Sequence, residues 1–231
     1  VMQSNGGLTS PEVAARLPVR LVLSGPSGGV IATRHVAESA GVGNSIAIDM
    51  GGTSLDVALL AGNEPHRLDE QRVMNLPVRG RALDILTIGA GGGSLAWVDE
   101  GGQFRVGPHS AAAVPGPACY GRGGTAATVT DANLVLGYLN AEAGVAGGEF
   151  RLDRDAALAA CAALGRQLGL TAVETAWGIR HIVNTAMAGA VRAASTRKGF
   201  DPRDFVLVAY GGAGPMHAVD IAREMGMQEV L

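Results

Sequence analysis

Residues 46–57 constrain the fold of this chain most, because they form the pattern of a buried strand, a tight turn and a returning strand. The run from Ser45 to Met50 is apolar apart from its first residue and Asp49. Two glycines and a threonine follow at 51–53, and apolar side chains then alternate from Leu55 to Leu59. This change from a continuous apolar run to alternation predicts a β-hairpin with a carboxylate beside its turn.

A hairpin of this kind is suited to binding phosphate groups. Gly51 and Gly52 carry no side chain, so their backbone N–H groups can approach phosphate oxygens, with Thr53 and Ser54 supplying hydroxyls. A carboxylate at the position of Asp49 can hold Mg²⁺ directly or through water. The alternative is an ordinary Gly-Gly turn in which Asp49 or Asp56 satisfies nearby backbone groups, and spacing alone does not separate the two.

A second unit lies near the end of the chain. Phe205 to Tyr210 is typical of a strand, and Gly211, Gly212, Ala213 and Gly214 follow it. A turn with so few side chains leaves flat space for a nucleobase or ribose. The helix expected from Met216 could also direct its positive end at a bound phosphate. On its own the unit is only a strand-to-helix turn.

Strands, loops and helices alternate along the chain, which predicts an α/β layered fold. The segment 107–130 is rich in Gly, Pro, Ala and Thr without periodicity, which is typical of a long functional loop. The expected helices cover 30–40, 153–167, 172–197 and 216–225. Thr171 and Glu174 have the spacing of a capping box before the third helix, and Gly169 and Gly226 are the expected stops of the second and fourth. The short apolar run 19–23 is strand-like, and the other expected strands are 45–50, 55–59, 83–88, 95–98, 104–106, 205–210 and 227–231. The expected buried faces carry Leu158, Cys161, Ala162 and Leu168 on one helix and Ala172, Ala176, Ile179, Val183, Ala186 and Ala190 on the next.

Composition excludes several classes of protein. With 231 residues, 47% hydrophobic content and a net charge of −3, the chain can bury a core and is not disordered. The small charge argues against nucleic acid or an anionic membrane as a partner. Cys119 and Cys161 form neither a metal motif nor a disulfide framework, and we expect packed thiols in a reducing cytoplasm.

Three motifs with known chemistry were tested. The run from Gly89 to Ser94 lacks the last glycine of a dinucleotide fingerprint, and Lys198, the sole lysine, does not stand in a phosphate-loop motif. The stretch 25–29 does match the Gly-x-Ser-x-Gly nucleophile elbow around Ser27, with Asp131 and His217 downstream as triad partners. We favour a helix entry made of small residues, while a serine hydrolase stays open. For Asp131 a helix-capping role is favoured, and for His217 a packing role beside the turn.

The hairpin and the second glycine turn together resemble the actin-like ATPase superfamily, and further strings resemble the hydantoinase A / 5-oxoprolinase family, which includes acetone carboxylase subunits. These strings run in order along nearly the whole chain: Met2 to Gly7, Ser24 to Val30, Asp49 to Ser54, Thr87 to Asp99, Pro115 to Thr125, Thr128 to Asn133 and Gly211 to Pro215.

The resemblance implies that residues 1–231 form one ribonuclease H-like α/β lobe of a two-lobed ATPase, with an upstream lobe and a C-terminal region absent. It implies ATP and Mg²⁺ as cofactors. Asp49 would be the catalytic and metal-organising carboxylate, Gly51 to Ser54 the phosphate hairpin, Ser24 to about Ala37 a connecting segment, and Gly211 to Gly214 the adenosine turn.

The activity implied is ATP-dependent hydrolysis of a cyclic amide (5-oxoproline, hydantoin or N-methylhydantoin), with a hydantoinase B-type subunit as partner. An ATP-dependent ketone carboxylase subunit and a non-catalytic nucleotide-binding assembly module are the alternatives. Two departures from the family pattern bear on substrate choice. Val114 stands where relatives usually have an aspartate, and Leu55 stands where they have a second threonine.

Overall fold

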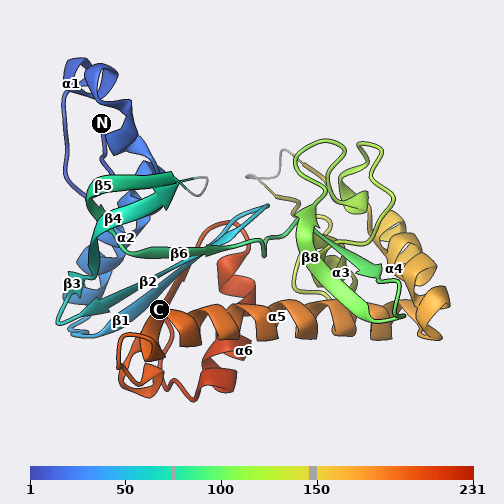
Figure 1. The fold of residues 1–231 in the computed structure, drawn as a ribbon. Coiled ribbons are helices and arrows are strands. Elements are labelled where there is room, and N and C mark those ends of the chain that lie inside the picture. Colours follow the sequence, from blue (N-terminus) through green and yellow to red (C-terminus); the bar gives the residue numbers. More distant parts are fainter. Residues whose placement is uncertain (74–75, 146–149) are drawn as a thin grey trace.

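The computed structural model describes residues 1–73, 76–145 and 150–231. Its centre is a mixed sheet of five strands, in which β3, β2, β1 and β9 lie side by side and β6 also pairs with β2 (Figure 1). Strand β1 runs antiparallel to β2 and parallel to β9. The strands are β1 (Ser45–Met50), β2 (Leu55–Ala61), β3 (Glu64–Pro65), β6 (Ile85–Ile88) and β9 (Val206–Tyr210).

Two further hairpins stand apart from this sheet, β4 (Arg67–Val73) with β5 (Leu76–Leu83) and β7 (Ser94–Val98) with β8 (Phe104–Ser110). The α-helices are α1 (Pro11–Arg16), α2 (Ser24–Ser39), α3 (Val129–Val135), α4 (Arg154–Leu168), α5 (Ala172–Thr196) and α6 (Gly214–Met225). Short 3₁₀ helices are η1 (Pro18–Leu21), η2 (Ala118–Tyr120) and η4 (Pro202–Asp204).

Helix α5 joins the two halves of the molecule. It runs from the group formed by β7, β8, α3 and α4 to the central sheet, where it packs beside α6 (Figure 1). Its start is fixed by the predicted capping box of Thr171 and Glu174, which is confirmed. Both halves of the molecule are therefore held by one continuous helix.

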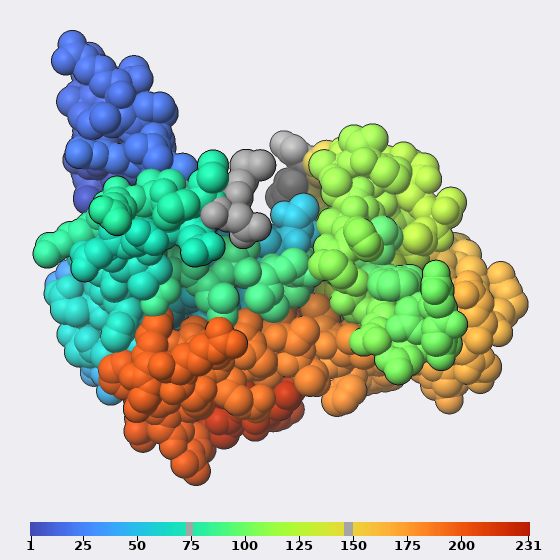
Figure 2. Space-filling view, viewed as in Figure 1, coloured from blue at the N-terminus to red at the C-terminus, as the bar shows by residue number. Residues whose placement is uncertain are grey.

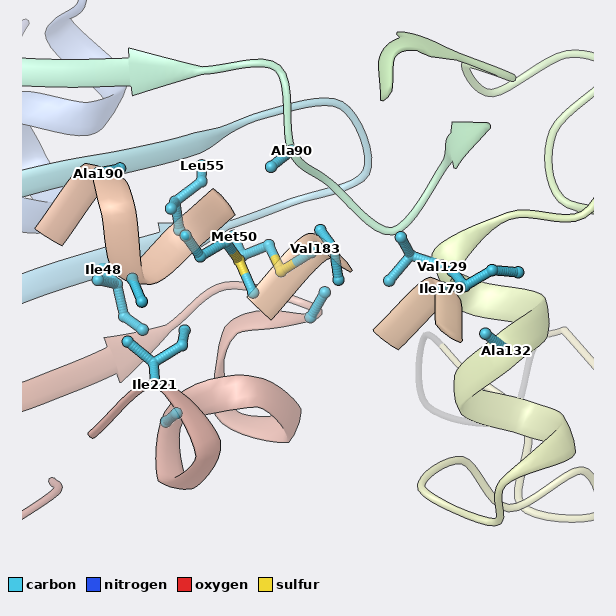
Figure 3. Close-up of a cluster of buried hydrophobic side chains, with 14 of the residues drawn as sticks. Ile48, Met50, Leu55, Ala90, Val129, Ala132, Ile179, Val183, Ala190 and Ile221 are labelled. Carbon is cyan, nitrogen blue, oxygen red and sulfur yellow. The ribbon is translucent and has the colours of Figure 1, made fainter. Parts of the chain in front are cut away.

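The two faces of the central sheet are covered by different helices. Ile46, Ile48 and Met50 of β1 pack into a large apolar cluster with α5 and α6. Ala47, on the opposite face of the strand, packs in a smaller cluster with Val30 of α2. Figure 3 shows the large cluster, in which hairpin side chains meet those of the two helices: Ile48, Met50, Leu55, Val183, Ala190 and Ile221. Burying this apolar surface stabilises the sheet and holds both glycine turns at one edge.

Several predicted elements are confirmed with small shifts. Helix α4 begins after Asp153 and ends at Gly169, but Leu158 and Ala162 are half-buried while Ala157, Ala160 and Leu164 are buried, so its buried face is rotated. On α5, Ala186 is exposed and Met187 takes the predicted buried position. The strand expected at 227–231 is present only as a bridge from Val230 to Leu207.

The start of α2 was predicted wrongly. The helix begins at Ser24 rather than Val30, and the apolar run before it is 3₁₀ helix η1 rather than a strand. Pro26 is tolerated in the first turn, where backbone N–H groups have no helical partner. Gly29 is needed because a Cβ there would lie 2.5 Å from the Tyr210 hydroxyl. Gly29 therefore allows close packing of helix α2 against strand β9.

Two other predicted segments have different bounds. The run 83–88 is divided at Asp84, where β5 ends and β6 begins. The loop predicted at 107–130 is shorter, because β8 continues to Ser110 and α3 begins at Val129. Among the described residues no single helix is long and apolar enough to cross a membrane, and α4 with α5 passes that test only as a pair bent by 86°.

Candidate functional site

The predicted β1–β2 hairpin is confirmed. The two strands pair without interruption up to Met50 and Leu55, and the Gly51 N–H donates to the Ser54 carbonyl across the turn (3.2 Å). Residues 51–53 are exposed, and Cβ atoms built on Gly51 or Gly52 would meet nothing within 4 Å. Figure 2 shows this light-blue end of the hairpin at the surface, in the hollow between the two halves. The turn therefore presents bare backbone to open space.

The second glycine turn lies directly against the first. Because β9 is parallel to β1, their carboxyl ends meet at one edge, where Tyr210 pairs with Asp49. Gly211 has φ +83°, and a Cβ there would lie 2.3 Å from Asp49 Oδ1. The Ala213 N–H donates to the Met50 carbonyl (2.9 Å). Helix α6 begins at Gly214, two residues before its predicted start, so its positive end lies at this turn.

A third glycine segment, 89–94, was not predicted to belong to the site. The Gly92 N–H donates to the Gly51 carbonyl (2.9 Å) and the Gly93 N–H to the Gly52 carbonyl (2.6 Å). A Cβ on Gly91 would lie 2.5 Å from the Thr53 nitrogen. These bonds hold the turn through the carbonyl groups of Gly51 and Gly52. The run of glycines between two strands was the available signal, because such runs often mark close backbone approach.

The first turn of α3 holds this third segment in place. The carbonyl of Gly92 accepts from both the backbone N–H and the hydroxyl of Thr130, at 2.7 and 2.8 Å. A Cβ on Gly92 would lie 2.7 Å from that hydroxyl oxygen. The turn is thus connected by hydrogen bonds to the rigid half of the molecule that contains α3.

Two carboxylates lie next to the turn. Asp49 and Asp56 are paired across β1 and β2, and Thr87 of β6 donates to the Asp56 carboxylate. Burial, with the neighbouring charge of Asp56, raises the pKa of Asp49 above its usual range. A pair of like charges at an open site favours a bound cation. The sequence indicates for Asp56 only a role in satisfying backbone groups of the turn, because sequence alone does not place it opposite Asp49.

The donor set suits Mg²⁺ shared with a ligand. Among the residues that the structure describes, no three His, Cys, Asp or Glu side chains gather as a metal-binding group. Mg²⁺ commonly takes one or two protein carboxylates and completes its shell with phosphate oxygens and water. Asp49, half-buried with Asp56 beside it and next to the open turn, fits that pattern. Leu55, by contrast, is fully buried in the core and presents nothing to the site.

The serine hydrolase alternative is wrong. Ser27 lies inside α2, is fully buried, and its hydroxyl lies 2.8 Å from the Leu23 carbonyl oxygen and 3.1 Å from that of Ser4. A nucleophile elbow needs an exposed serine between a strand and a helix. His217 is also buried and is held by Asn133 and Asn184, so the residues of the supposed triad are not brought together.

The remaining candidates are structural, as predicted. Asp131 forms a capping box with Thr128 at the start of α3. Both cysteines are buried, and burial raises the thiol pKa of Cys119 well above its usual range and that of Cys161 to about 12. A thiol with so high a pKa is a packing group rather than a nucleophile.

Comparison with known families decides the identity of this arrangement. The family described as hydantoinase/oxoprolinase matches residues 1–231. The chain belongs to this family. It is 42% identical over 230 residues to the caprolactamase subunit alpha of Pseudomonas jessenii, covering 99% of this chain and 33% of the relative. It is 38% identical over 244 residues to the 5-oxoprolinase of Saccharomyces cerevisiae, covering 100% of this chain and 18% of that relative.

Solved structures agree with the fold. The nucleotide-free structure of acetone carboxylase superposes with a TM-score of 0.90 at 33% identity, covering 100% of this chain and 32% of that one. The ATP-dependent caprolactamase from P. jessenii superposes with a TM-score of 0.88 at 41% identity, covering 99% and 33%. The prediction of an α/β lobe of the actin-like ATPase type, with a mixed sheet and packed helices, is confirmed. The chain spans about a third or less of the length of these relatives.

Proposed function

We propose that the protein containing this chain uses ATP to hydrolyse a cyclic amide such as 5-oxoproline, a hydantoin or a lactam. The observation that supports this most is the meeting of the turns 51–54 and 211–214 at one sheet edge, with Asp49 between them. ATP would phosphorylate the amide oxygen, which makes the carbonyl carbon electrophilic for attack by water. Caprolactamase and 5-oxoprolinase are the relatives whose names support this class of substrate.

Each part of the site has a role in this proposal. Residues 51–54 bind phosphate oxygens, through backbone N–H groups other than that of Gly51, which donates to the Ser54 carbonyl, and through the Thr53 and Ser54 hydroxyls. The flat turn 211–214 holds adenosine. Asp49 would hold Mg²⁺, and the ion would supply positive charge to neutralise the phosphate groups. The positive end of α6 adds a favourable field for the anionic ligand.

Phosphoryl transfer of this kind depends on positioning and on charge stabilisation more than on a protein nucleophile. The chain supplies both through backbone. The bonds from Gly92 and Gly93 to the carbonyls of Gly51 and Gly52 fix the turn before any ligand arrives. Donors fixed in this way need little reorganisation during the reaction.

Partner and compartment are also proposed. Relatives are named as subunits, namely caprolactamase subunit alpha and acetophenone carboxylase gamma subunit. A second, hydantoinase B-type subunit would complete the enzyme and supply residues that this chain lacks. The two free, buried cysteines fit a cytoplasmic protein.

A second candidate function uses the same ATP site but transfers the phosphoryl group to a different substrate, a ketone. The match to the acetone carboxylase structure favours ATP-dependent carboxylation of a ketone, in which the phosphoryl group would go to an enolate oxygen. The nucleotide chemistry is identical in both cases, so only the substrate distinguishes them. A non-catalytic module would hydrolyse ATP without stimulation by any small molecule.

The test is ATP hydrolysis by the full-length protein, with and without its partner subunit. 5-Oxoproline, hydantoin, N-methylhydantoin, ε-caprolactam, and acetone with bicarbonate are the substrates. We expect stimulation by at least one cyclic amide, and stimulation by acetone alone would favour the carboxylase.

The variant Asp49→Asn should lower kcat/KM by roughly 10²- to 10³-fold, because a site for charge stabilisation is lost. Asp69→Asn is the matched control, since that carboxylate is 96% exposed on β4 and should leave activity unchanged. Full activity in Asp49→Asn would contradict the proposed mechanism.

A further inference from the structure

A groove of about 340 Å³ lies beside the long loop between β8 and α3, and we call it the loop groove. This loop is the yellow-green segment above β8 in Figure 1. The volume is at the small end of the range of about 300–1,000 Å³ usual for small-molecule sites. Its lining includes Leu95, Ser110, Ala112, Val114, Gly124 and Ala126.

The loop groove is uncharged. Among the described residues, none of those lining it carries an ionisable side chain. Small apolar side chains, backbone groups and the hydroxyls of Ser110 and Thr125 make up the wall. Moving a carboxylate from water to such a surface is costly without a cationic partner. The groove therefore suits a neutral ligand with one or two polar atoms.

The walls of the loop groove are rigid. The Asp131 carboxylate accepts from the N–H groups of Ala118 (3.2 Å) and Cys119 (2.8 Å), which fixes the middle of the loop. The two sides of the loop touch, because a Cβ on Gly124 would lie 2.1 Å from the Gly116 carbonyl oxygen. Backbone held this firmly is preorganised for a ligand and loses little entropy when one binds.

The loop groove is also joined to the phosphate turn. The Ala111 N–H donates to the Gly93 carbonyl (2.8 Å), and the Gly93 N–H donates to the Gly52 carbonyl (2.6 Å). Ser110 lies on this boundary, with its Oγ 2.9 Å from where a Gly93 Cβ would be. One residue thus separates the groove wall from the turn proposed to hold phosphate.

We propose that the loop groove holds the uncharged ring of a cyclic amide, next to the phosphoryl group that activates it. The ring methylenes contact Leu95, Val114 and Ala126. The hydroxyl of Ser110, whose oxygen accepts from the Ala112 N–H (3.1 Å), donates a hydrogen bond to the amide oxygen. The inference rests on the proposed function and narrows it, since a neutral lactam is preferred over 5-oxoproline, which carries a carboxylate.

The test measures ligand binding directly, by equilibrium dialysis of radiolabelled ε-caprolactam against the full-length protein in its complex. Ala126→Leu fills the groove from an exposed position, so the fold is preserved. We expect it to raise the Kd for ε-caprolactam by about tenfold or more, since a misplaced group of this size in an apolar site costs that much. Ala113→Leu, exposed on the same loop but outside the lining, is the matched control and should bind normally.

A second variant tests the charge argument. Val114 is 75% exposed at the rim, so Val114→Arg adds a cation without burying it. It should change the ratio of the two Kd values in favour of 5-oxoproline over ε-caprolactam by about tenfold. An unchanged ratio would show that neither ligand contacts this rim and would overturn the inference.

The outcomes separate the two proposals. Normal ε-caprolactam binding by Ala126→Leu, or no binding by the wild-type protein, overturns the loop groove as a subsite even if ATP hydrolysis is stimulated by another cyclic amide. Conversely, weakened binding in Ala126→Leu with normal binding in Ala113→Leu supports the subsite even if no cyclic amide stimulates ATP hydrolysis. In that case only the proposed function fails.

Discussion

Asp49 and Asp131 are both aspartates close to a glycine-rich segment, but their surroundings are opposite. Asp131 is fully buried, and its carboxylate accepts from the N–H groups of Ala118, Cys119 and Thr128 and from the Thr128 hydroxyl. Asp49 is half-buried and faces the carboxylate of Asp56 and the bare backbone of Gly211. One carboxylate is saturated with donors, and the other is placed next to a like charge.

This difference separates a structural carboxylate from one that awaits a ligand. Four donors around Asp131 compensate for the loss of water, so the group stabilises the fold and has no capacity left for chemistry. The pKa of Asp49 is raised by burial and by Asp56, so its charged form is disfavoured until a cation arrives. Function is therefore expected where the protein leaves a charge uncompensated.

The sharpest test of this comparison is the same substitution at both positions. Asp131→Asn places an amide NH₂ group against N–H donors in a buried site, so the free energy of unfolding should fall by about 3 kcal/mol. In a folding unit of the size of this chain that corresponds to a loss of roughly 6–12 °C in melting temperature, and in a longer cooperative unit to less. Asp49→Asn removes a repulsion, so its melting temperature should equal or slightly exceed that of the wild type. Thermal melting of the full-length variants without nucleotide measures both.

ATP hydrolysis should show the reverse order at a temperature where both variants are folded. Asp49→Asn should lose roughly 10²- to 10³-fold in kcat/KM, whereas Asp131→Asn should retain activity in proportion to its folded fraction. Equal melting temperatures for the two variants would contradict the assignment of Asp131 as a structural carboxylate.

Gly211 and Gly212 are neighbours that differ in the same way, because Gly211 is packed tightly against Asp49 whereas Gly212 faces open space. In Gly211→Ala the new Cβ would lie 2.3 Å from Asp49 Oδ1 and 2.6 Å from the Met50 carbonyl, at φ +83°. We expect a loss of about 2 kcal/mol in stability together with loss of ATP hydrolysis, because Asp49 must move.

Gly212→Ala is the matched control, since a Cβ there meets nothing within 4 Å. Its melting temperature should be unchanged, and KM for ATP should rise by about tenfold if adenosine lies over this turn. Thermal melting and ATP kinetics of both variants are the measurements. A normal KM in Gly212→Ala would place the adenosine elsewhere.

Local sequence signals predicted most of the fold. The capping box at Thr171, the glycine stops at Gly169 and Gly226, and the alternation after Gly52 all depend on neighbouring residues, and all are confirmed. The start of α2 was missed because Gly29 serves a contact with Tyr210, which is far away in the chain. A composition rich in glycine and proline resembles a loop when its packing partner is unknown.

The candidate site, like the fold, was predictable only where it depends on neighbouring residues. Asp49 and the turn that follows it form one continuous motif, so their proximity is dictated by the hairpin. The segment 89–94 meets this turn only because β6 pairs with β2 and ends beside it, which is a property of the sheet and not of any local pattern. Asp56 needed the register of β1 against β2 before its contact with Asp49 could be seen.

The smallest expected effect concerns His217, another saturated polar group. Its Nδ1 lies 2.6 Å from Asn184 Oδ1 and its Nε2 lies 3.0 Å from Asn133 Nδ2, so the geometry assigns the proton to Nδ1 and the acceptor role to Nε2. Burial, then the charge of Arg180, lowers the pKa of His217 to about 3, while Asp220 opposes this. In the folded protein His217 is therefore neutral at pH values well above 3.

Because the folded pKa lies below the unfolded value of about 6.5, this contribution is complete above that pH and is lost as the pH falls towards 3. About 2 kcal/mol should be lost between pH 7 and pH 5, at about 1.4 kcal/mol per unit. His217→Gln removes the titrating group, so the stability difference between wild type and variant should shrink by that amount over the same range. Urea unfolding of both proteins at pH 7, 6 and 5 measures this difference. If the free energies of unfolding of wild type and variant changed equally with pH, protonation of His217 would not destabilise the fold, and the prediction would be wrong.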